Sequence, residues 1–459
     1  KLKNKYYSLN KIKKILDKIN KLSEIKDYQF LTSELVETTD GDKISIDINI
    51  GQSEKYFVER VNIVGNSITN DNVIRGEMLV DEGDAYNSLI LNKSLNNLRS
   101  RNIFASVKET TKQGSTPDLK VIEIEIEEKA TGEIAIGAGV GTSGGTLGFN
   151  LSENNFMGKG IVLDTNLNIT TNKITGRFSI QNPNYNYSGN SVTTTIESTS
   201  VDRSDEFGYQ TDRAGIFLST FFEQYEDIYL APEISVNYES LQTDDKASSA
   251  MKKQAGTFFD TYLSYSIIRD KRDQKFNTTE GNRLLFTQTV PVYSSSPNIV
   301  NGLDYSTYYP LKDSIIASIK FYSRAINSLS ASDDVRLSKR LHIPERRLRG
   351  FERGKIGPTD SGDYIGGNYA SALSFNTAFP KLFSGLQNAD FSLFLDAGNV
   401  WGVDYDKKLD GANKIRSAFG LSATWHTVMG PLSFSLSQAL SKTSTDVPES
   451  FRFNLGTTF

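Results

Sequence analysis

The sequence predicts a mainly β protein, with an antiparallel transmembrane β-barrel of sixteen strands preceded by α+β modules of the order β-α-α-β-β. Two observations lead to this fold class. After residue 130 the chain consists of segments of about ten residues in which apolar and polar side chains alternate, as in barrels with a lipid face and a lumen. Before residue 130, apolar residues with helical spacing lie between alternating segments.

The composition agrees with this interpretation. Hydrophobic residues make up 37% of the 459 residues, which is below the ~45–50% of soluble globular domains. No stretch approaches the ~20 consecutive apolar residues of a membrane-spanning helix. The net charge of −4 does not indicate a nucleic-acid partner, and the absence of cysteine excludes disulfides and thiolate metal sites. Because Lys1 opens polar, basic sequence without a signal peptide, we expect a mature fragment or a truncated chain.

Residues 1–55 and 56–129 are interpreted as two copies of one module. In the second copy, a strand over Phe57–Val64 precedes helices over Asn70–Met78 and Tyr86–Arg101, and two strands follow. The first copy shows a basic helix and two strands, so we interpret it as the C-terminal part of a module. The helix is expected to pack on the sheet, although a membrane-surface helix is an alternative. Such a repeat indicates an array of modules.

From residue 130 to 459 the helical spacing stops and the alternation continues, as in Ile161–Ile169. We expect short connections such as Asn155–Lys159 to alternate with long ones such as Ile326–Gly366, as in outer-membrane barrels. A soluble β-sandwich also alternates. The chain stops on Phe459 within an alternating segment, however, and this would leave an exposed apolar edge in an open sheet. The barrel is therefore favoured.

Two glycine-rich segments do not indicate enzyme chemistry. Gly139–Gly144 fits GxGxxG, but a dinucleotide site requires a helix directly afterwards, and the next residues alternate as a strand. Gly141–Gly145 fits GxSxG, which requires a histidine partner. Neither His342 nor His426 lies in a recognisable triad context. We therefore expect no catalytic residue, no metal site and no cofactor, and we interpret the protein as a non-enzyme.

The most informative segment is the long connection 326–366. Its centre, residues 346–358, combines arginines with glycine, aromatic and proline residues, which favours a defined fold over a solvated charged loop. Arginine is well suited to bind a carboxylate through two parallel hydrogen bonds. The alternation along Phe391–Ala397 directs Asp396 into the lumen. We therefore predict that Arg349 and Asp396 pair inside the barrel, where removal of one partner is costly.

These residues carry a resemblance to the BamA family of outer-membrane β-barrel assembly factors. Leu348-Arg349-Gly350-Phe351 is similar to the VRGF/Y motif on the family's inward-folded sixth extracellular loop, and Gly357 fits the Ile-Gly-Pro that follows. Residues 396–401 are similar to the strand that carries the aspartate partner of the motif arginine. Where some members have a lumenal glutamate, this sequence has Ser374, which implies one carboxylate partner for Arg349 instead of two.

The resemblance extends over essentially the whole chain. Residues 154–160 are similar to the turn after the second barrel strand, and residues 454–459 are similar to the last strand with its kink glycine. Residues 56–129 resemble the last periplasmic POTRA domain of the family, and residues 1–55 the C-terminal part of the fourth-type module before it. The barrel is then expected over residues 130–459.

The resemblance implies a core component of the machinery that folds and inserts β-barrel proteins into the bacterial outer membrane, with the POTRA modules in the periplasm. Its implied partners are nascent β-barrel proteins, accessory outer-membrane lipoproteins, periplasmic chaperones and membrane lipid, and no nucleic acid. Insertion would use a lateral seam between the first and last barrel strands. Glycine weakens strand packing, and the residues expected at the seam are Gly132, Gly137, Gly139, Gly141, Gly456 and Phe459.

Three alternatives remain open from the sequence. Related transporters for two-partner secretion or autotransporter assembly share the barrel and the loop motif. A passive porin would also suit the long loops and the many tyrosines. An outer-membrane hydrolase is disfavoured because the two histidines are isolated.

Overall fold

The computed structural model describes residues 12, 15, 16, 18, 19, 22, 30–41, 43–52, 54–142, 144–275, 277–312, 315–330, 334–380, 382, 389–427 and 430–456. The chain forms two compact units. The first contains Lys1–Gly132 with the short segments Glu153–Val162 and Asn182–Ser188, and the second contains the remaining residues. In the described part, no helix is both long and apolar enough to cross a membrane.

The first unit begins with the predicted helix and two strands. Ile12 and Ile19 are helical and buried. Strands β1 (Leu31–Asp40) and β2 (Lys43–Gln52) pair in antiparallel register, with Leu35 opposite Ile48.

The next elements confirm the predicted β-α-α-β-β order. They are β3 (Phe57–Val64), α2 (Asp71–Arg75), α3 (Ser88–Ser100), β4 (Phe104–Gln113) and β5 (Leu119–Glu128). The sheet order is β3-β5-β4, with β5 parallel to β3 and antiparallel to β4. Because the chain must cross over to place β5 parallel to β3, helices α2 and α3 lie between the paired strands in sequence.

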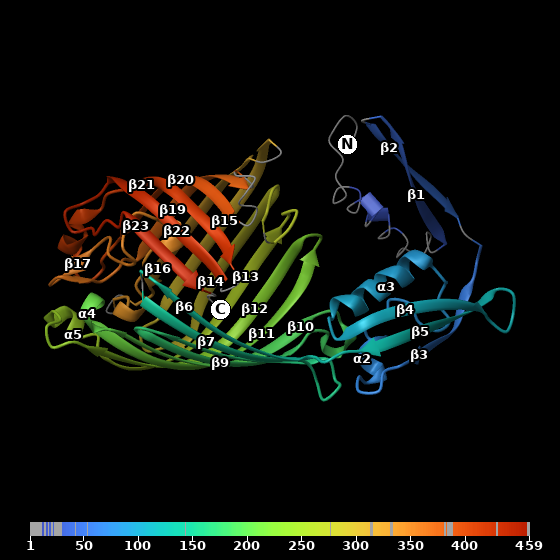
Figure 1. The fold of residues 1–459 in the computed structure, drawn as a ribbon. Helices are drawn as coiled ribbons and strands as arrows, with labels where there is room; N and C mark the ends of the chain where they lie inside the picture. Colours follow the sequence, from blue (N-terminus) through green and yellow to red (C-terminus); the bar gives the residue numbers. More distant parts are fainter. Residues whose placement is uncertain are drawn as a thin grey trace. The chain divides into compact units, whose positions relative to one another are not determined.

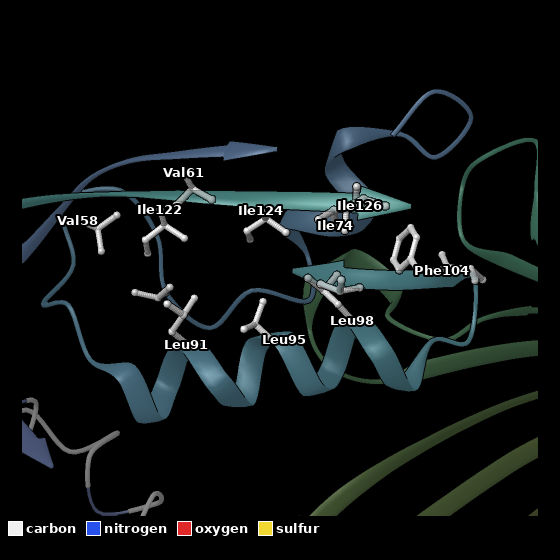
Figure 2. Packing of buried hydrophobic residues seen from close by; sticks show 13 residues of the cluster. Val58, Val61, Ile74, Leu91, Leu95, Leu98, Phe104, Ile122, Ile124 and Ile126 are labelled. Carbon is white, nitrogen blue, oxygen red and sulfur yellow. The ribbon is translucent and has the colours of Figure 1, made fainter. Parts of the chain in front are cut away.

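The core of this domain lies between α3 and the sheet (Figure 2). Leu91, Leu95 and Leu98 occupy one face of α3, because residues four and three apart lie on the same side of a helix. They face Ile122 and Ile124 of β5, which are fully buried. The helix starts where the Asn87 side chain accepts hydrogen bonds from the N–H groups of Leu89 and Ile90.

The barrel is a closed antiparallel sheet of sixteen strands, as predicted. Each strand pairs with its sequence neighbour in the barrel, and β23 pairs with β6 (Figure 1). The strands are β6 (Gly132–Gly141), β7 (Gly144–Phe156), β8 (Ile161–Thr170), β9 (Lys173–Asn182), β10 (Ser191–Arg203), β11 (Tyr209–Tyr225), β12 (Ile228–Thr243), β13 (Gly256–Asp270), β14 (Gly281–Ser294), β15 (Asn298–Lys312), β16 (Ile315–Ser328), β19 (Tyr369–Pro380), β20 (Ala389–Trp401), β21 (Arg416–Thr427), β22 (Gly430–Ser441) and β23 (Phe451–Gly456).

The alternation of side chains sets the two faces of the barrel. On β20, Leu393 and Leu395 are 47% and 44% exposed, whereas Phe394 and Asp396 are 4% and 0% exposed. Since successive side chains of a strand point to opposite faces, the exposed leucines face outward and Asp396 faces the lumen. The outer face is therefore apolar and the inner face carries the polar and charged side chains.

The predicted alternation of short and long connections is only partly correct. Among the connections at the end where β6 finishes, residues 171–172 and 295–297 form short turns, whereas residues 204–208 and 244–255 form longer ones. At the opposite end, residues 271–280 form a longer connection than expected. Its fold is local, because the Asp273 carboxylate accepts hydrogen bonds from the backbone N–H and the hydroxyl of Thr279.

The longest connection joins β16 to β19. It contains the short 3-10 turns η3 (Leu337–Lys339) and η4 (Glu345–Arg347) and a small hairpin of β17 (Thr359–Asp360) and β18 (Asp363–Tyr364). Other connections carry η2 (Tyr185–Tyr187), α4 (Ser204–Phe207), α5 (Ser249–Lys252) and η5 (Lys407–Ala412).

Candidate functional site: the lumenal loop and the strand closure

The connection between β16 and β19, which we call the lumenal loop (residues 329–368), packs against the inner face of the barrel. Leu348, Phe351 and Ile356 are buried in a cluster with side chains of the barrel wall. The wall residues of this cluster are Tyr322, Ala370, Ala372, Val400 and Ala418. Small alanines on the wall leave room for the larger loop side chains, so the loop is fitted into the lumen.

Gly350 in this loop requires glycine for two reasons. Its φ of +88° lies in the region that L side chains rarely adopt. A Cβ at this position would also lie 2.6 Å from the Cβ of Ala418. The backbone can therefore approach the β21 wall closely only because residue 350 has no side chain.

Arg349 binds Asp396 of β20 through two parallel hydrogen bonds. Its Nε lies 2.7 Å from Oδ2 and its Nη2 lies 2.8 Å from Oδ1. The Arg349 backbone N–H also donates to Oδ2 at 3.0 Å. The Asp396 side chain is fully buried, and a buried charge is tolerated only when it is paired and hydrogen-bonded. The structure thus brings together the two residues that the sequence suggested as a pair.

Polar neighbours complete the surroundings of this pair. Ser374 donates its hydroxyl to Asp396, and Arg349 Nη2 donates to Asn376 Oδ1 at 2.7 Å. The Arg349 guanidinium lies 3.6 Å from the ring centre of Phe394, which is a cation–π contact. In the described ranges, Asp396 is the one carboxylate that forms an ion pair with Arg349. Ser374 Oγ and Asn376 Oδ1 both accept hydrogen bonds from Arg349 Nη2.

Three further arginines of the lumenal loop form ion pairs with barrel strands or with the connection after β20, and no motif in the sequence indicates these pairs. Arg336 binds both Glu239 of β12 and Asp260 of β13. Arg340 binds Asp404, which follows β20. Arg347 binds Asp304 of β15, with Nη2 2.6 Å from Oδ1. One feature of the sequence could have indicated such pairs. Several strands carry a single carboxylate at a lumen-facing position, and the loop carries several arginines that could bind them.

The loop connections also share an apolar core at the end where β6 finishes. It contains Phe207, Tyr209, Leu241, Met251, Leu337, Ile365 and Val403, which come from several different connections and strand ends. His342 packs beside this core, with its ring centre 4.8 Å from that of Phe207. Burial, reinforced by the positive charge of Arg203, lowers the pKa of His342 to about 4, so its ring is neutral at pH 7.

His342 lies in an apolar and basic environment, and the His426 side chain lies outside the described residues. No group of three or more His, Cys, Asp or Glu residues is placed to hold a metal ion within the described ranges.

The barrel closes between β6 and β23. In the described residues, Gly139 pairs with Gly456, Val140 with Leu455, and Gly141 with Asn454. The Thr142 N–H also donates to the carbonyl oxygen of Phe453 at 3.0 Å. We call this closure the seam.

Two of the seam glycines have no space for a side chain, and the third has little. A Cβ on Gly141 would lie 2.6 Å from the Phe453 carbonyl oxygen, and one on Gly456, whose φ is +108°, would lie 2.3 Å from the Ala138 carbonyl oxygen. A Cβ on Gly139 would lie 3.1 Å from the Leu455 carbonyl oxygen. The predicted seam residues Gly132 and Gly137 lie in β6 before these pairs, and Phe459 lies outside the described residues.

Comparison with known families gives two matches. Residues 155–459, more than half of the chain, match the Omp85 superfamily domain. Residues 56–129 match POTRA, described as a surface antigen variable number repeat. The second match coincides with the β3-α2-α3-β4-β5 domain.

Curated relatives carry the name outer membrane protein assembly factor BamA. The protein from Neisseria meningitidis serogroup B is 23% identical over 461 residues, which cover 90% of this chain and 58% of the relative. The protein from Neorickettsia risticii is 22% identical and covers 91% of this chain and 57% of the relative. The chain thus spans a little over half the length of these relatives.

Solved structures share the fold. The crystal structure of BamA from Haemophilus ducreyi lacking POTRA domains 1–3 has a TM-score of 0.79 at 22% identity and covers 99% of this chain and 94% of that one. CdiB from Acinetobacter baumannii has a TM-score of 0.57 at 12% identity, covering 93% of this chain and 78% of that one. With its closed barrel, its POTRA domain and the family match over the barrel, this chain belongs to the Omp85 superfamily.

Proposed function

We propose that this chain is the barrel-containing core of an outer-membrane protein assembly factor, which folds and inserts β-barrel proteins through the seam. The observation that carries the proposal is the β6–β23 closure, where three glycines lie in the contact and two of them, Gly141 and Gly456, have no space for a side chain. Curated relatives along 90% of the chain bear the name of such a factor. The barrel lies in the bacterial outer membrane, with the POTRA domain on its periplasmic side.

The chemistry of the seam suits a strand as substrate. Opening β6 from β23 would expose backbone N–H and C=O groups, and an extended segment of another chain can pair with such an edge. The lumen-side positions of β6 hold Glu133 at its start and then Ala135, Gly137, Gly139 and Gly141, and its outward positions include Ile134, Ile136 and Val140. After Glu133, an incoming strand would therefore meet an inner face of small residues and an apolar lipid-side face.

The partners follow from the same proposal. The substrates are nascent outer-membrane β-barrel proteins, and the surrounding lipid receives them. The POTRA domain, together with the end of a preceding module in residues 1–55, is proposed to receive unfolded clients from periplasmic chaperones and to bind accessory lipoproteins. Assembly by strand exchange uses no cofactor and no catalytic residue.

A related transporter of the same superfamily is the second candidate, because the Omp85 match over residues 155–459 does not distinguish the two roles. A passive porin is not favoured. The lumenal loop and its ion pairs to β12, β13, β15 and β20 occupy the inside of the barrel, where a porin would have an open channel.

Site-specific cross-linking to a client tests the proposal. A cysteine in place of Val140 would report on strands that pair with β6, because the sequence contains no other cysteine. During insertion of an unfolded β-barrel client into vesicles that contain the full chain, we expect a disulfide between this cysteine and one in a terminal strand of the client. A cysteine in place of Ile216, which faces outward on β11, is the control. Equal cross-linking at both positions, or none at Val140, would contradict insertion at the seam.

A further inference from the structure

Arg452 is a buried arginine on the seam strand β23. Its neighbour Phe451 is 48% exposed on the outer face, whereas Arg452 is 9% exposed and faces the lumen. Its Nη2 donates to the Phe351 carbonyl oxygen at 3.0 Å and to the Glu449 carboxylate. Its Nη1 lies 3.8 Å from Glu345 Oε2. The seam strand thus binds the phenylalanine of the Leu348–Phe351 motif directly.

The residues before β23 pair with the same part of the loop. Phe351 lies opposite Pro448 in an antiparallel bridge. The Glu352 N–H donates to the Val447 carbonyl oxygen at 2.9 Å, and the Glu449 N–H donates to the Gly350 carbonyl oxygen at 3.0 Å. The loop motif therefore adds a short strand to the segment that leads into β23.

The other side of the same segment forms the seam. The Phe453 carbonyl oxygen accepts from the Thr142 N–H, and Asn454 lies opposite Gly141. Over a few residues, the chain is bound to the lumenal loop through Glu449 and Arg452 and to the β6 side through Phe453 and Asn454. The Gly350 that joins these contacts follows Arg349, which is fixed to Asp396.

A polar cavity of about 230 Å³ borders this connection. Its lining includes Thr142, Glu352, Glu449 and Arg452. A cavity of this size has room for several water molecules, since each occupies ~30 Å³ in the liquid. Water can therefore replace the partners of Arg452 when the loop and β23 separate, so the contact can open without leaving a dry, unpaired charge.

We propose that Arg452 is a positioning residue that couples the lumenal loop to the seam. This inference rests on the proposed function, because it assigns a control to the same seam. Arg452 and the backbone pairs hold the start of β23 to the loop, and Arg349 holds the loop to β20. Loss of the Arg452 contacts frees the start of β23, and the β6–β23 hydrogen bonds then break more often, although no seam residue has changed.

Hydrogen exchange of the full chain in lipid vesicles tests this coupling. We expect the seam amides, including the Thr142 N–H, to exchange about tenfold faster in Arg452→Gln, the effect of losing one charged hydrogen bond. Arg452→Lys keeps a cationic donor and should restore part of the protection. Arg213→Gln is the matched control, because Arg213 also binds the loop, through Ser338 O, and pairs with Glu239 of β12, but contacts no described residue of β23.

Two outcomes would overturn the proposal. One is a rate of hydrogen exchange at the seam amides of a folded Arg452→Gln barrel that equals the rate in the parent protein. The other is an equal increase in all strands, which would show a role in general stability only. If Arg452→Gln does not fold, Glu352→Pro takes its place in the same exchange measurement, because proline lacks the N–H that binds Val447 O. Glu352→Ala, which keeps this N–H, is its control. The assay contains no client, so a failure of client insertion through the seam would not affect its result.

Discussion

Arg349 Nε lies 2.7 Å from Asp396 Oδ2 and Arg349 Nη2 lies 2.8 Å from Oδ1, so a loop guanidinium and a β20 carboxylate form a bidentate ion pair inside the barrel. The pair fixes the loop at the residue directly before Gly350, whose carbonyl oxygen binds the segment leading to β23. The lumenal loop thereby connects β20 with β23, one of the two strands that form the seam.

Removal of either partner of this pair should destabilise the barrel. For Arg349→Ala and for Asp396→Ala we expect a loss of about 3 kcal/mol in the free energy of unfolding, because each leaves a buried charge without its partner. Urea unfolding of the barrel in lipid vesicles measures the loss. Arg346→Ala, at an exposed arginine of the same loop, should be close to neutral. Full stability of Asp396→Ala would show that the pair does not brace the loop.

Gly350→Ala should destabilise the barrel through both its φ and its contact with Ala418. We expect a loss of about 1–3 kcal/mol for the backbone conformation alone, with a further loss from the Cβ contact at 2.6 Å. Gly362→Ala is the matched control, because Gly362 has a φ of +98° and no atom within 4 Å of its Cβ position. The double variant Gly350→Ala/Ala418→Gly should recover the steric part in thermal unfolding. Equal effects of the two single variants would exclude a role for the close approach.

Gly456→Ala should weaken the seam. A Cβ there would lie 2.3 Å from the Ala138 carbonyl oxygen in a backbone conformation that favours glycine. We expect faster hydrogen exchange at Thr142 in this variant. Gly176→Ala, at an open position on β9, should exchange as the parent does. Unchanged seam exchange in Gly456→Ala would show that the close contact does not control the closure.

The POTRA domain should lose stability in acid through Glu128. Burial raises the pKa of this carboxyl, but hydrogen bonds from Thr69, Ser67 and Ile68 outweigh the effect and lower the pKa to about 2. Because the folded pKa is below the ordinary glutamate value of 4.5, the contribution of Glu128 to stability is complete above pH 4.5 and is lost as the pH falls toward 2. Glu128→Gln should therefore destabilise the domain at pH 7 and much less at pH 3.

Urea unfolding followed by helical circular dichroism, which reports on α3, measures the effect of Glu128→Gln. Glu127→Gln is the control, because Glu127 lies on the opposite face of β5 and accepts a hydrogen bond from Ser106. A Glu128→Gln effect that is the same at pH 7 and pH 3 would contradict the assigned titration.

The lumenal loop should prevent steady conduction. In planar bilayers we expect the full chain to show no large, permanently open pore, because loop side chains and ion pairs occupy the lumen. Arg336→Ala/Arg347→Ala should increase transient conductance by releasing the loop from β13 and β15. A large constant conductance of the parent protein would favour the porin alternative.

Most of the fold could be predicted from the periodicity of apolar residues. Lipid-facing and lumen-facing residues alternate along strands such as β8 and β20, and this alternation by itself indicates the strands of a barrel. Asp396 could be assigned to the lumen for the same reason. The partners of Arg336, Arg340 and Arg347 could not, since they depend on which strands face each other across the lumen. Nor does any pattern predict that Phe351 lies opposite Pro448, almost a hundred positions later, because this contact arises only when the loop folds inward.

The register of the seam also required the structure. Glycine content marked β6 and the last strand, but it did not show that Leu455 pairs with Val140 and not with a residue nearer Gly137. Register depends on the closure of the whole sheet, and a shift of one residue reverses the side on which each side chain lies.

Locking the seam tests the central claim most directly. Val140 and Leu455 are paired across β6 and β23, so Val140→Cys/Leu455→Cys should form a disulfide. Leu432→Cys/Leu455→Cys, which joins β22 to β23 and leaves the seam free, is the matched control. Insertion of an unfolded β-barrel client into vesicles is then measured before oxidation, after oxidation and after reduction. We predict that oxidation abolishes insertion in the seam pair only and that reduction restores it, whereas undiminished insertion with the seam fully cross-linked would contradict the account.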